Sequence, residues 1–397
     1  MNAIASITIR TAHLLEQWRS RFASNTGRAG LVGLTTGVFY GIWAIRYLTR
    51  HSIYDLAAIG TQFLAQGQGS STTIDALGPH AIEGGYDGQF ALYIALDPLN
   101  AHHYLDEPTY RMGRILYPIT ARIVAVGHAG AIPWMLLFIN IAAVVFGTFA
   151  LALLLVRRNV SPWLALLFGA SPALWIAVDR DITEPLAYAL VIGALLALDS
   201  QRWLTSGLIF GLAGLTRETT LLFPLALIIM AAWGLGVKRR RPDELMLFGA
   251  IAFGPYIWLR VALYSWLGSD PPPGPPSLSW PPFSGLSGQA PQSQYEQILA
   301  VVFPGFLALA AAILFLHGRR KWMILPLALN VLVLIALLPE SSYATFQSSG
   351  RISLGVVVAF ALCLPDLPNQ RRTAAVVVPA LLWFTPWYDF FPIAFIS

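Results

Sequence analysis

Residues 131–156 read AIPWMLLFINIAAVVFGTFALALLLV and contain no charged side chain. A helix needs roughly 20 mostly apolar residues to cross the hydrocarbon core of a bilayer, so this run is long enough to span it. The whole chain has the same character, since 56% of its 397 residues are hydrophobic and 11% are charged. A water-soluble fold of this length would expose a largely apolar surface. The sequence therefore predicts an integral membrane protein.

Apolar runs of similar length recur along the chain and predict an all-α polytopic membrane protein with about eleven transmembrane helices. The predicted spans are 29–48, 131–156, 161–178, 184–200, 203–217, 219–236, 246–266, 297–317, 322–339, 351–366 and 372–391. Residues 29–397 then form a single transmembrane domain. Residues 1–28 are basic and mildly amphipathic without a cleavage site, which predicts a cytoplasmic surface segment rather than a signal peptide.

The cations fall mainly in alternate connections between these spans, on the side that holds the N-terminus. Only Glu16, Asp199, Asp243, Glu244 and Asp366 of the 20 acidic residues share that side. Cytoplasmic loops carry an excess of Lys and Arg, so the pattern predicts a cytoplasmic N-terminus and an extracytoplasmic C-terminus. The cations on this side are Arg10, Arg19, Arg21, Arg28, Arg157, Arg158, Arg202, Lys238, Arg239, Arg240, Arg241, Arg319, Arg320, Lys321, Arg371 and Arg372.

Two outer segments are long. Residues 49–130 form the first outer loop, in which ILYPITARIVAVGHAG (115–130) predicts an interfacial helix or a re-entrant segment, because Arg122 interrupts it. Residues 267–296 are rich in Pro, Gly and Ser and predict an extended, weakly structured loop.

The first outer loop contains GGYDGQFALYIALDP (84–98), a polar turn followed by an apolar run. Asp87 is consistent with a turn residue, because Tyr-Asp-Gly-Gln is favourable turn chemistry. It is also consistent with a general base presented to an acceptor hydroxyl. Asp97-Pro98 is expected to end the helical run, because the residue before proline leaves the α region.

Further charged residues gather on the predicted outer face, each with a structural alternative. Arg111 and Arg114 would share a helix face suited to a phosphate or to lipid headgroups. Asp181 or Thr183 is expected to cap the helix that Pro185 begins, whereas Glu184 lies at the mouth of a span.

Two later arginines also have alternative roles. Arg217 and Glu218 fit a local ion pair or a site for a lipid phosphate. Arg351 is expected at the start of a helix, where the macrodipole disfavours a cation. Its position there indicates either an anion pocket or a snorkelling side chain.

The chain resembles the GT-C superfamily of membrane glycosyltransferases, and within it the bacterial relatives of the GPI second-mannosyltransferase group. The matching pieces occur in the family's order and cover roughly residues 84–224. They are YDGQFALYIALDP (86–98), RILYP (114–118), SPALWIAVDRDITEPLAYAL (171–190) and GLAGLTRETTLLFP (211–224).

This resemblance implies transfer of a sugar from a polyprenyl-phosphate donor to an acceptor hydroxyl, outside a bacterial inner membrane. Asp87 would be the catalytic base. The donor phosphate would be bound by Arg217, Arg351 and Arg114, and the substrates by Gln89, Tyr86, Glu184, Glu218 and Asp181. The expected partners are the lipid-linked sugar, a glycan, lipid or protein acceptor, and membrane lipids, with no nucleic acid.

No cofactor is expected from the residues themselves. The first outer loop has no Asp-Asp or Glu-x-Asp pair, so a divalent metal has no support in the sequence. Two other functions remain open. A lipid-linked sugar flippase would be expected to carry charged or broken-helix positions near the bilayer midplane. A glycan polymerase or ligase would use residues 267–296 to gate a wide cleft.

Overall fold

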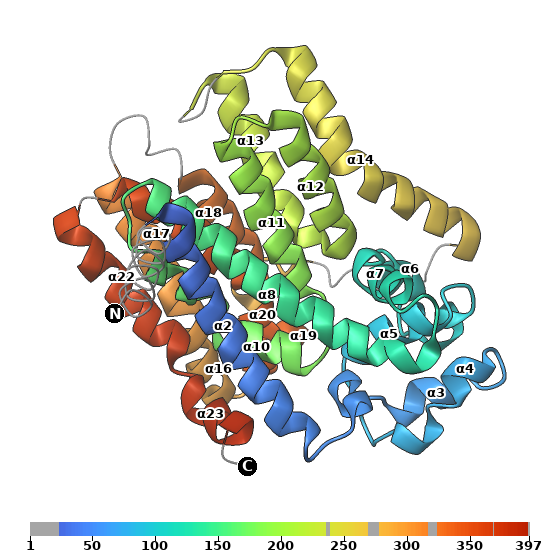
Figure 1. Cartoon of the computed structure of the whole chain (residues 1–397). Coiled ribbons are helices and arrows are strands. Elements are labelled where there is room, and N and C mark those ends of the chain that lie inside the picture. The colour runs from blue at the N-terminus through green and yellow to red at the C-terminus, as the bar shows by residue number, and fades with distance from the viewer. Residues whose placement is uncertain (1–23, 236–238, 269–277, 317–323, 368, 396–397) are drawn as a thin grey trace, which may run out of the picture.

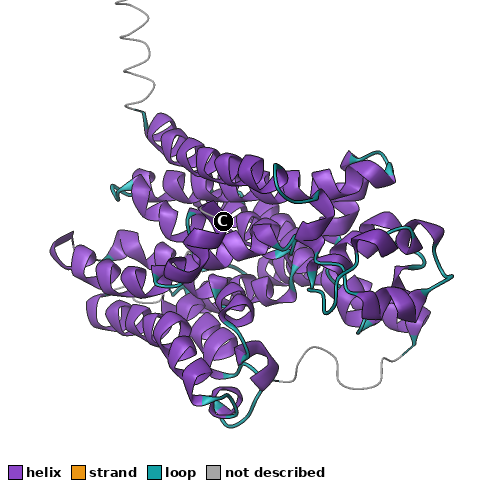
Figure 2. Cartoon of the chain, turned by 90° about the horizontal axis from the view of Figure 1, so that it is seen from below, coloured by secondary structure: helices purple, strands orange, loops and turns teal. Residues whose placement is uncertain are grey.

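The computed structural model describes residues 24–235, 239–268, 278–316, 324–367 and 369–395. In this part of the chain the elements are helices joined by loops, and no strand is formed (Figure 2). The predicted all-α fold is confirmed. Residues 1–23 of the predicted cytoplasmic segment lie outside the described residues. Residues 269–277, the most proline-rich part of the second outer loop, also lie outside them.

Five helical segments of the described chain are long and apolar enough to cross a membrane. They are α2 (Asn25–Leu48), Ala129–Arg157 with α8 (Ile132–Arg157), α14 (Pro242–Leu267), Pro291–Phe315, and Phe346–Asp366. Pro162–Gly169 and Pro172–Asp179 meet the same criterion together, with a 48° bend between them. This composition is that of a helical membrane protein. The remaining predicted spans coincide with shorter helices, among them α11 (Glu184–Asp199), α12 (Trp203–Thr216) and α13 (Leu222–Trp233).

Five helices pack side by side, in the order α2, α8, α11, α12 and α14 (Figure 1). Glycines allow this close approach, as small residues do between membrane helices. A Cβ on Gly147 would lie 3.3 Å from Ala189, and one on Gly211 would lie 2.7 Å from the carbonyl oxygen of Ile251. At the outside of the row, α14 exposes Met246, Trp258 and other large apolar side chains.

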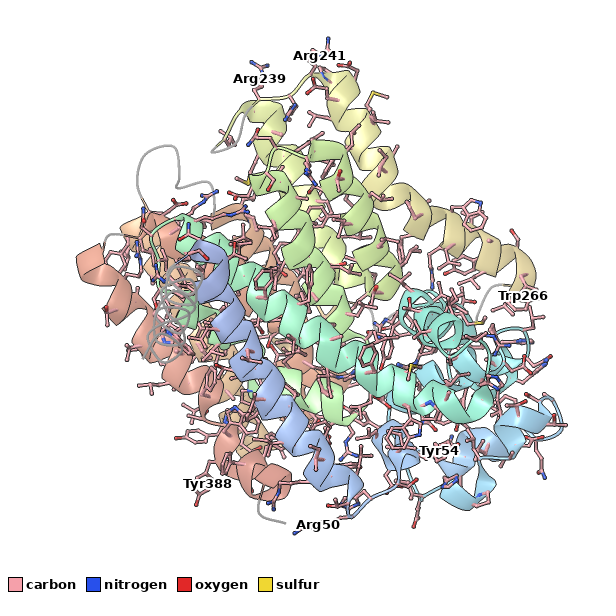
Figure 3. The ribbon with its side chains drawn as sticks, viewed as in Figure 1. Arg50, Tyr54, Arg239, Arg241, Trp266 and Tyr388 are labelled. Carbon is pink, nitrogen blue, oxygen red and sulfur yellow. The ribbon has the colours of Figure 1, made fainter. Side chains whose placement is uncertain are left out.

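The basic residues directly before α14 lie far from the C-terminal end of α2 and from α23 (Trp387–Phe395). Figure 3 shows Arg239 and Arg241 at one end of the molecule, and Arg50 and Tyr388 at the other. A chain that crosses a membrane several times places its connections alternately on the two sides. Arg50 and Arg239 are therefore separated by most of the length of the molecule.

Residues 49–130 form a helical layer beside the row, on the right of Figure 1. Its larger helices are α3 (Thr61–Gly67), α5 (Gly88–Leu96), α6 (Pro108–Met112) and α7 (Leu116–Val124). At nine residues, α7 is too short to span a bilayer, so the segment 115–130 is not a full span.

The end of α5 at Leu96, directly before Asp97-Pro98, confirms the predicted stop. Arg122 of α7 donates to the carbonyl oxygens of Ala95 and Leu96 at 2.9 and 2.6 Å. These carbonyls belong to the last turn of α5, where no helical partner is available. The cation that interrupts the predicted segment therefore holds α5 in place.

Several predicted boundaries were wrong. The first span begins earlier, at Asn25, because the Ser24 hydroxyl accepts from the amide of Gly27 and caps the helix. The predicted span 351–366 begins with a separate short helix, α20 (Phe346–Ile352), followed by α21 (Leu354–Cys363). The predicted span 372–391 is broken into α22 (Asn369–Phe384) and α23 at Pro386, since the residue before proline leaves the α region.

The second outer loop is helical in its described half, which corrects the prediction of a weakly structured loop. It contains α15 (Ser284–Ser287) and α16 (Pro291–Gln297), and α15 packs against α19 (Glu340–Tyr343). A Cβ on Gly285 would lie 2.2 Å from the carbonyl oxygen of Leu338. This tight contact orders the segment despite its composition.

Candidate functional site

Asp87 lies at the N-terminal end of α5, and the glycines around it explain how it is presented. Gly84 and Gly85 have φ of 93° and 105°, a region that only glycine enters without strain. Gly88 touches the turn between α10 (Pro172–Asp179) and α11. A Cβ there would lie 2.0 Å from the carbonyl oxygen of Arg180. The sequence GGYDG therefore fixes Asp87 against a distant part of the chain.

Gly88→Ala is expected to destabilise the protein by about 1–3 kcal/mol, because the added methyl group meets backbone that cannot rotate away. The measurement is thermal unfolding of the purified protein in detergent. Gly130→Ala is the matched control, since a Cβ at Gly130 meets no atom within 4 Å. Equal changes in the two variants would contradict the close approach of α5 to the 180–183 turn.

Both carboxylate oxygens of Asp87 are engaged by arginines. Arg111 of α6 places Nη1 3.1 Å from Oδ1, and Arg351 of α20 donates from Nη2 to Oδ2. Arg111 also donates to Asp106, with contacts of 2.8 and 2.6 Å. Asp87 is thus shared between an element of the 49–130 layer and an element near the C-terminus. These are brought together only by the fold, which places α20 near the centre of the molecule (Figure 1).

The same series of ion pairs continues into the interior. Glu184, fully buried at the start of α11, accepts from Arg351 at 3.3 Å and from Arg217 at 2.7 Å. The local pair between Arg217 and Glu218, one of the two roles considered for these residues, is not formed. Arg217 is extended at the end of α12 and its side chain turns to Glu184.

Glu218 pairs instead with Arg114, which donates to it at 3.0 and 2.6 Å and also to the hydroxyl of Tyr110. Four arginines and four carboxylates therefore balance one another in the arginine–carboxylate cluster, which comprises Asp87, Asp106, Arg111, Arg114, Glu184, Arg217, Glu218 and Arg351.

The cluster determines the charge state of Asp87. Burial raises the pKa of this carboxyl, but the cations of Arg351 and Arg111 outweigh burial and hold the pKa below its usual range. Asp87 is therefore ionised at neutral pH. Arg351 lies in the last turn of α20, which corrects its predicted place at the start of a helix. There the helix dipole favours a cation.

A small cleft, partly open to solvent, adjoins the cluster. Its charged lining consists of Asp87, Arg111, Arg114 and Arg351. Most of the remaining lining is apolar and comes from α5, α7 and the 180–183 turn: Phe90, Ala91, Ile94, Pro118 and Ile182, with Thr183 beside them. The cleft therefore joins a polar end to an apolar wall.

The other predicted site residues lie around this cleft rather than in it. Tyr86 places its ring under Arg351, 5.2 Å from the guanidinium carbon. Gln89 is buried, and its Oε1 accepts from the Gly60 amide at 2.8 Å, so it holds the loop that carries Asp87. Glu184, Arg217 and Glu218 line no part of the cleft. Glu184 pairs with Arg351 and Glu218 with Arg114, so these two carboxylates hold arginines of the cleft, whereas Arg217 pairs with Glu184 behind it.

Asp181 is buried, faces Tyr117, and lines no part of the cleft. Burial, together with the neighbouring Asp179, raises the pKa of Asp181 well above its usual range. The expected side-chain cap on α11 is not formed: Thr183 is the N-cap residue and makes no capping hydrogen bond.

Sequence reasoning considered Arg111 for a phosphate without assigning it to the donor site, and it gave Asp106 no role there. Arg111 is three residues before Arg114, and this spacing was a usable signal. However, α6 ends at Met112, so the two arginines do not share a helix face as predicted. The role of Asp106 could not be predicted from the sequence, because it depends on where the fold places Arg111.

Within the described ranges, no group of three His, Cys, Asp or Glu side chains is arranged to hold a metal ion. Comparisons of the chain with protein-family models, with curated proteins and with solved structures find no match. The geometry of the cleft and cluster is therefore the basis for assigning a function.

Proposed function

We propose that this protein is a membrane glycosyltransferase of the GT-C type, which moves a sugar from a polyprenyl-phosphate donor to an acceptor hydroxyl on the extracytoplasmic face. The reaction would serve cell-surface glycan or glycolipid assembly. The observation that carries this proposal is the cleft, in which three arginines surround one carboxylate beside a mostly apolar lining. A polyprenyl-phosphate donor has two matching parts, an anionic phosphate and an apolar chain.

Two features of the arginines support phosphate binding: three of them line the cleft, and one has an N–H donor without a hydrogen-bond partner. A guanidinium forms paired hydrogen bonds to phosphate oxygens. Arg351 lines the cleft, and its Nε is buried without a hydrogen-bond partner among the described residues. A buried donor without a partner costs free energy that a bound anion would recover. Arg351 is therefore the first residue assigned to the donor phosphate, with Arg111 and Arg114 beside it.

The pairing of Asp87 with Arg111 and Arg351 suggests how donor binding prepares the base. Each arginine holds a second carboxylate, Asp106 for Arg111 and Glu184 for Arg351. When the phosphate replaces Asp87 on both arginines, their other ion pairs remain. Asp87 is then released as a free carboxylate, and its basicity rises because the two cations no longer stabilise its charge.

The released carboxylate takes the proton of the acceptor hydroxyl. The acceptor oxygen forms a bond to the anomeric carbon of the sugar, and the bond from that carbon to the phosphate oxygen breaks. The electron pair stays on the leaving polyprenyl phosphate, which gains one negative charge as Asp87 becomes neutral. Arginines already in place stabilise this developing charge without a general acid.

The membrane arrangement belongs to the same proposal. About eleven helical segments would cross the bilayer, some of them short or broken. The end that holds Arg239 and Arg241 would face the cytoplasm, because basic connections are retained there. Asp87 would then lie outside, in a bacterial inner membrane. The exposed apolar side chains of α14 would face the lipid.

The test is transfer of label from a panel of polyprenyl-phosphate sugars by the purified protein in lipid vesicles, with total membrane glycan and lipid extracts as acceptors. We expect labelled product from at least one donor. No transfer from any donor, together with movement of the lipid-linked sugar across the bilayer, would contradict the proposal and favour a flippase. Transfer of preassembled oligosaccharides in preference to single sugars would favour a polymerase or ligase.

A further inference from the structure

A second, larger cavity lies at the end of the molecule that carries Tyr388 in Figure 3. It is a groove of about 1850 Å³, including space open to solvent. Three parts of the chain form it: α16 with the π-helical turn Ile298–Val302, the start of α20, and the break between α22 and α23. No residue of this groove lines the cleft beside Asp87.

The groove combines aromatic rings with polar side chains that have no partner in the described part of the chain. Tyr295, Phe346 and Tyr388 supply rings. Among the described residues, the side chains of Gln292, Glu296, Gln347 and Asp389 take part in no hydrogen bond or ion pair. Carboxylates accept hydrogen bonds and amides both donate and accept them. A polyhydroxylated ligand offers the complementary groups, and the apolar faces of sugar rings suit aromatic walls.

The charge of the groove selects among ligands. Two carboxylates line it, Glu296 and Asp389, and its described lining contains no Lys or Arg. A phosphate headgroup would therefore be repelled here, whereas it is attracted by the arginines of the cleft. The groove thus suits a ligand without negative charge. This distinguishes it from the place of the donor phosphate.

One short helix connects the two cavities. Phe346 and Gln347 of α20 line the groove, and Arg351 of the same helix lines the cleft. Gln347 and Arg351 are separated by about 6 Å along the helix axis, at 1.5 Å per residue. Buried Ser349 ties α20 to α16 by donating to Gln297. A ligand in the groove therefore lies next to the helix that holds Asp87 in place.

We propose that the groove binds the neutral carbohydrate part of the acceptor. This inference rests on the proposed glycosyltransferase function, to which it adds the acceptor class and a second binding site. Glu296, Gln347 and Asp389 hydrogen-bond to sugar hydroxyls, and Tyr388 packs against a ring face. These residues bind the acceptor and take no part in the chemical step.

The first test is binding of methyl glycosides of common hexoses and pentoses, measured by saturation-transfer NMR on the protein in nanodiscs. The wild type and Asp87→Asn are both expected to bind at least one glycoside. In the double variant Glu296→Gln/Asp389→Asn we expect binding to weaken about tenfold, since neutral hydrogen bonds replace charge-assisted ones. Glu83→Gln, an exposed carboxylate outside both cavities, is the control and is expected to bind as the wild type does.

A steric variant provides an independent check. Ala344→Trp places a large side chain at an exposed position of the lining, so the variant is expected to fold as the wild type does. We expect it to abolish glycoside binding and to raise the KM for acceptor about tenfold or more, with kcat within about twofold. Unchanged binding in both groove variants would overturn the inference, as would binding of anionic phospholipid that these variants abolish. Loss of transfer in Asp87→Asn with intact glycoside binding is the result expected when both proposals hold. Groove-dependent glycoside binding by a protein that transfers no sugar would contradict the transferase proposal alone, and sugar transfer that both groove variants leave unchanged would contradict the groove proposal alone.

Discussion

Asp87→Asn is expected to lower the rate of sugar transfer by about 10²–10⁴-fold, the range that a general base contributes. Asparagine has nearly the same size but cannot take the proton of the acceptor hydroxyl. The fold is expected to survive, because Arg111 keeps its pair with Asp106 and Arg351 keeps its pair with Glu184. The measurement is initial transfer velocity in lipid vesicles, with equal amounts of folded protein confirmed by thermal unfolding.

The same variant has a second expected property that a merely structural role would not produce. Donor binding is expected to tighten, since the carboxylate no longer competes with the phosphate for Arg111 and Arg351. Glu83→Gln is the matched control for loss of one carboxylate in the same loop, and it is expected to change neither transfer nor donor affinity. Wild-type transfer by Asp87→Asn would exclude Asp87 as the base.

Glu184→Ala is expected to destabilise the protein by about 3–5 kcal/mol, the cost of breaking a buried ion pair from one side. Glu184 is the only carboxylate paired with Arg217 in the described structure, and the Arg217 side chain is only 4% exposed. Without Glu184 this guanidinium remains buried and uncompensated. The measurement is unfolding in detergent by heat or denaturant, followed by intrinsic fluorescence.

Asp199→Asn is the matched control, because Asp199 pairs with Arg157 and Arg158, whose side chains are 39% and 46% exposed. Exposed pairs contribute about 0–1 kcal/mol, so this variant is expected to remain close to the wild type. Adding Arg217→Met to Glu184→Ala is expected to recover part of the lost stability, since it removes the unpaired charge. Similar decreases in the free energy of unfolding for Glu184→Ala and Asp199→Asn would show that the buried pair contributes no more to stability than the exposed one.

Local sequence patterns determined the helical architecture of this protein. An apolar run such as 131–156 forms a helix because only internal hydrogen bonds satisfy its backbone in an apolar environment. The stop at Asp97-Pro98 was equally local, because proline restricts the residue before it. The presentation of Asp87 by a glycine-rich segment could also be anticipated, since positive φ angles favour glycine. These features depend on residues within a few positions of one another.

The partners of Asp87 were decided only by the tertiary structure. Arg351 reaches it across a sequence separation of 264 residues, and Glu184 reaches Arg351 across 167. A local pair between the neighbouring residues Arg217 and Glu218 fitted the sequence as well as a lipid-phosphate site did, yet each residue pairs with a side chain of another element. Burial explains this outcome, because a buried charge requires a compensating charge at contact distance, and sequence neighbours point in different directions. The sequence thus determined which elements form, and packing determined which charges meet.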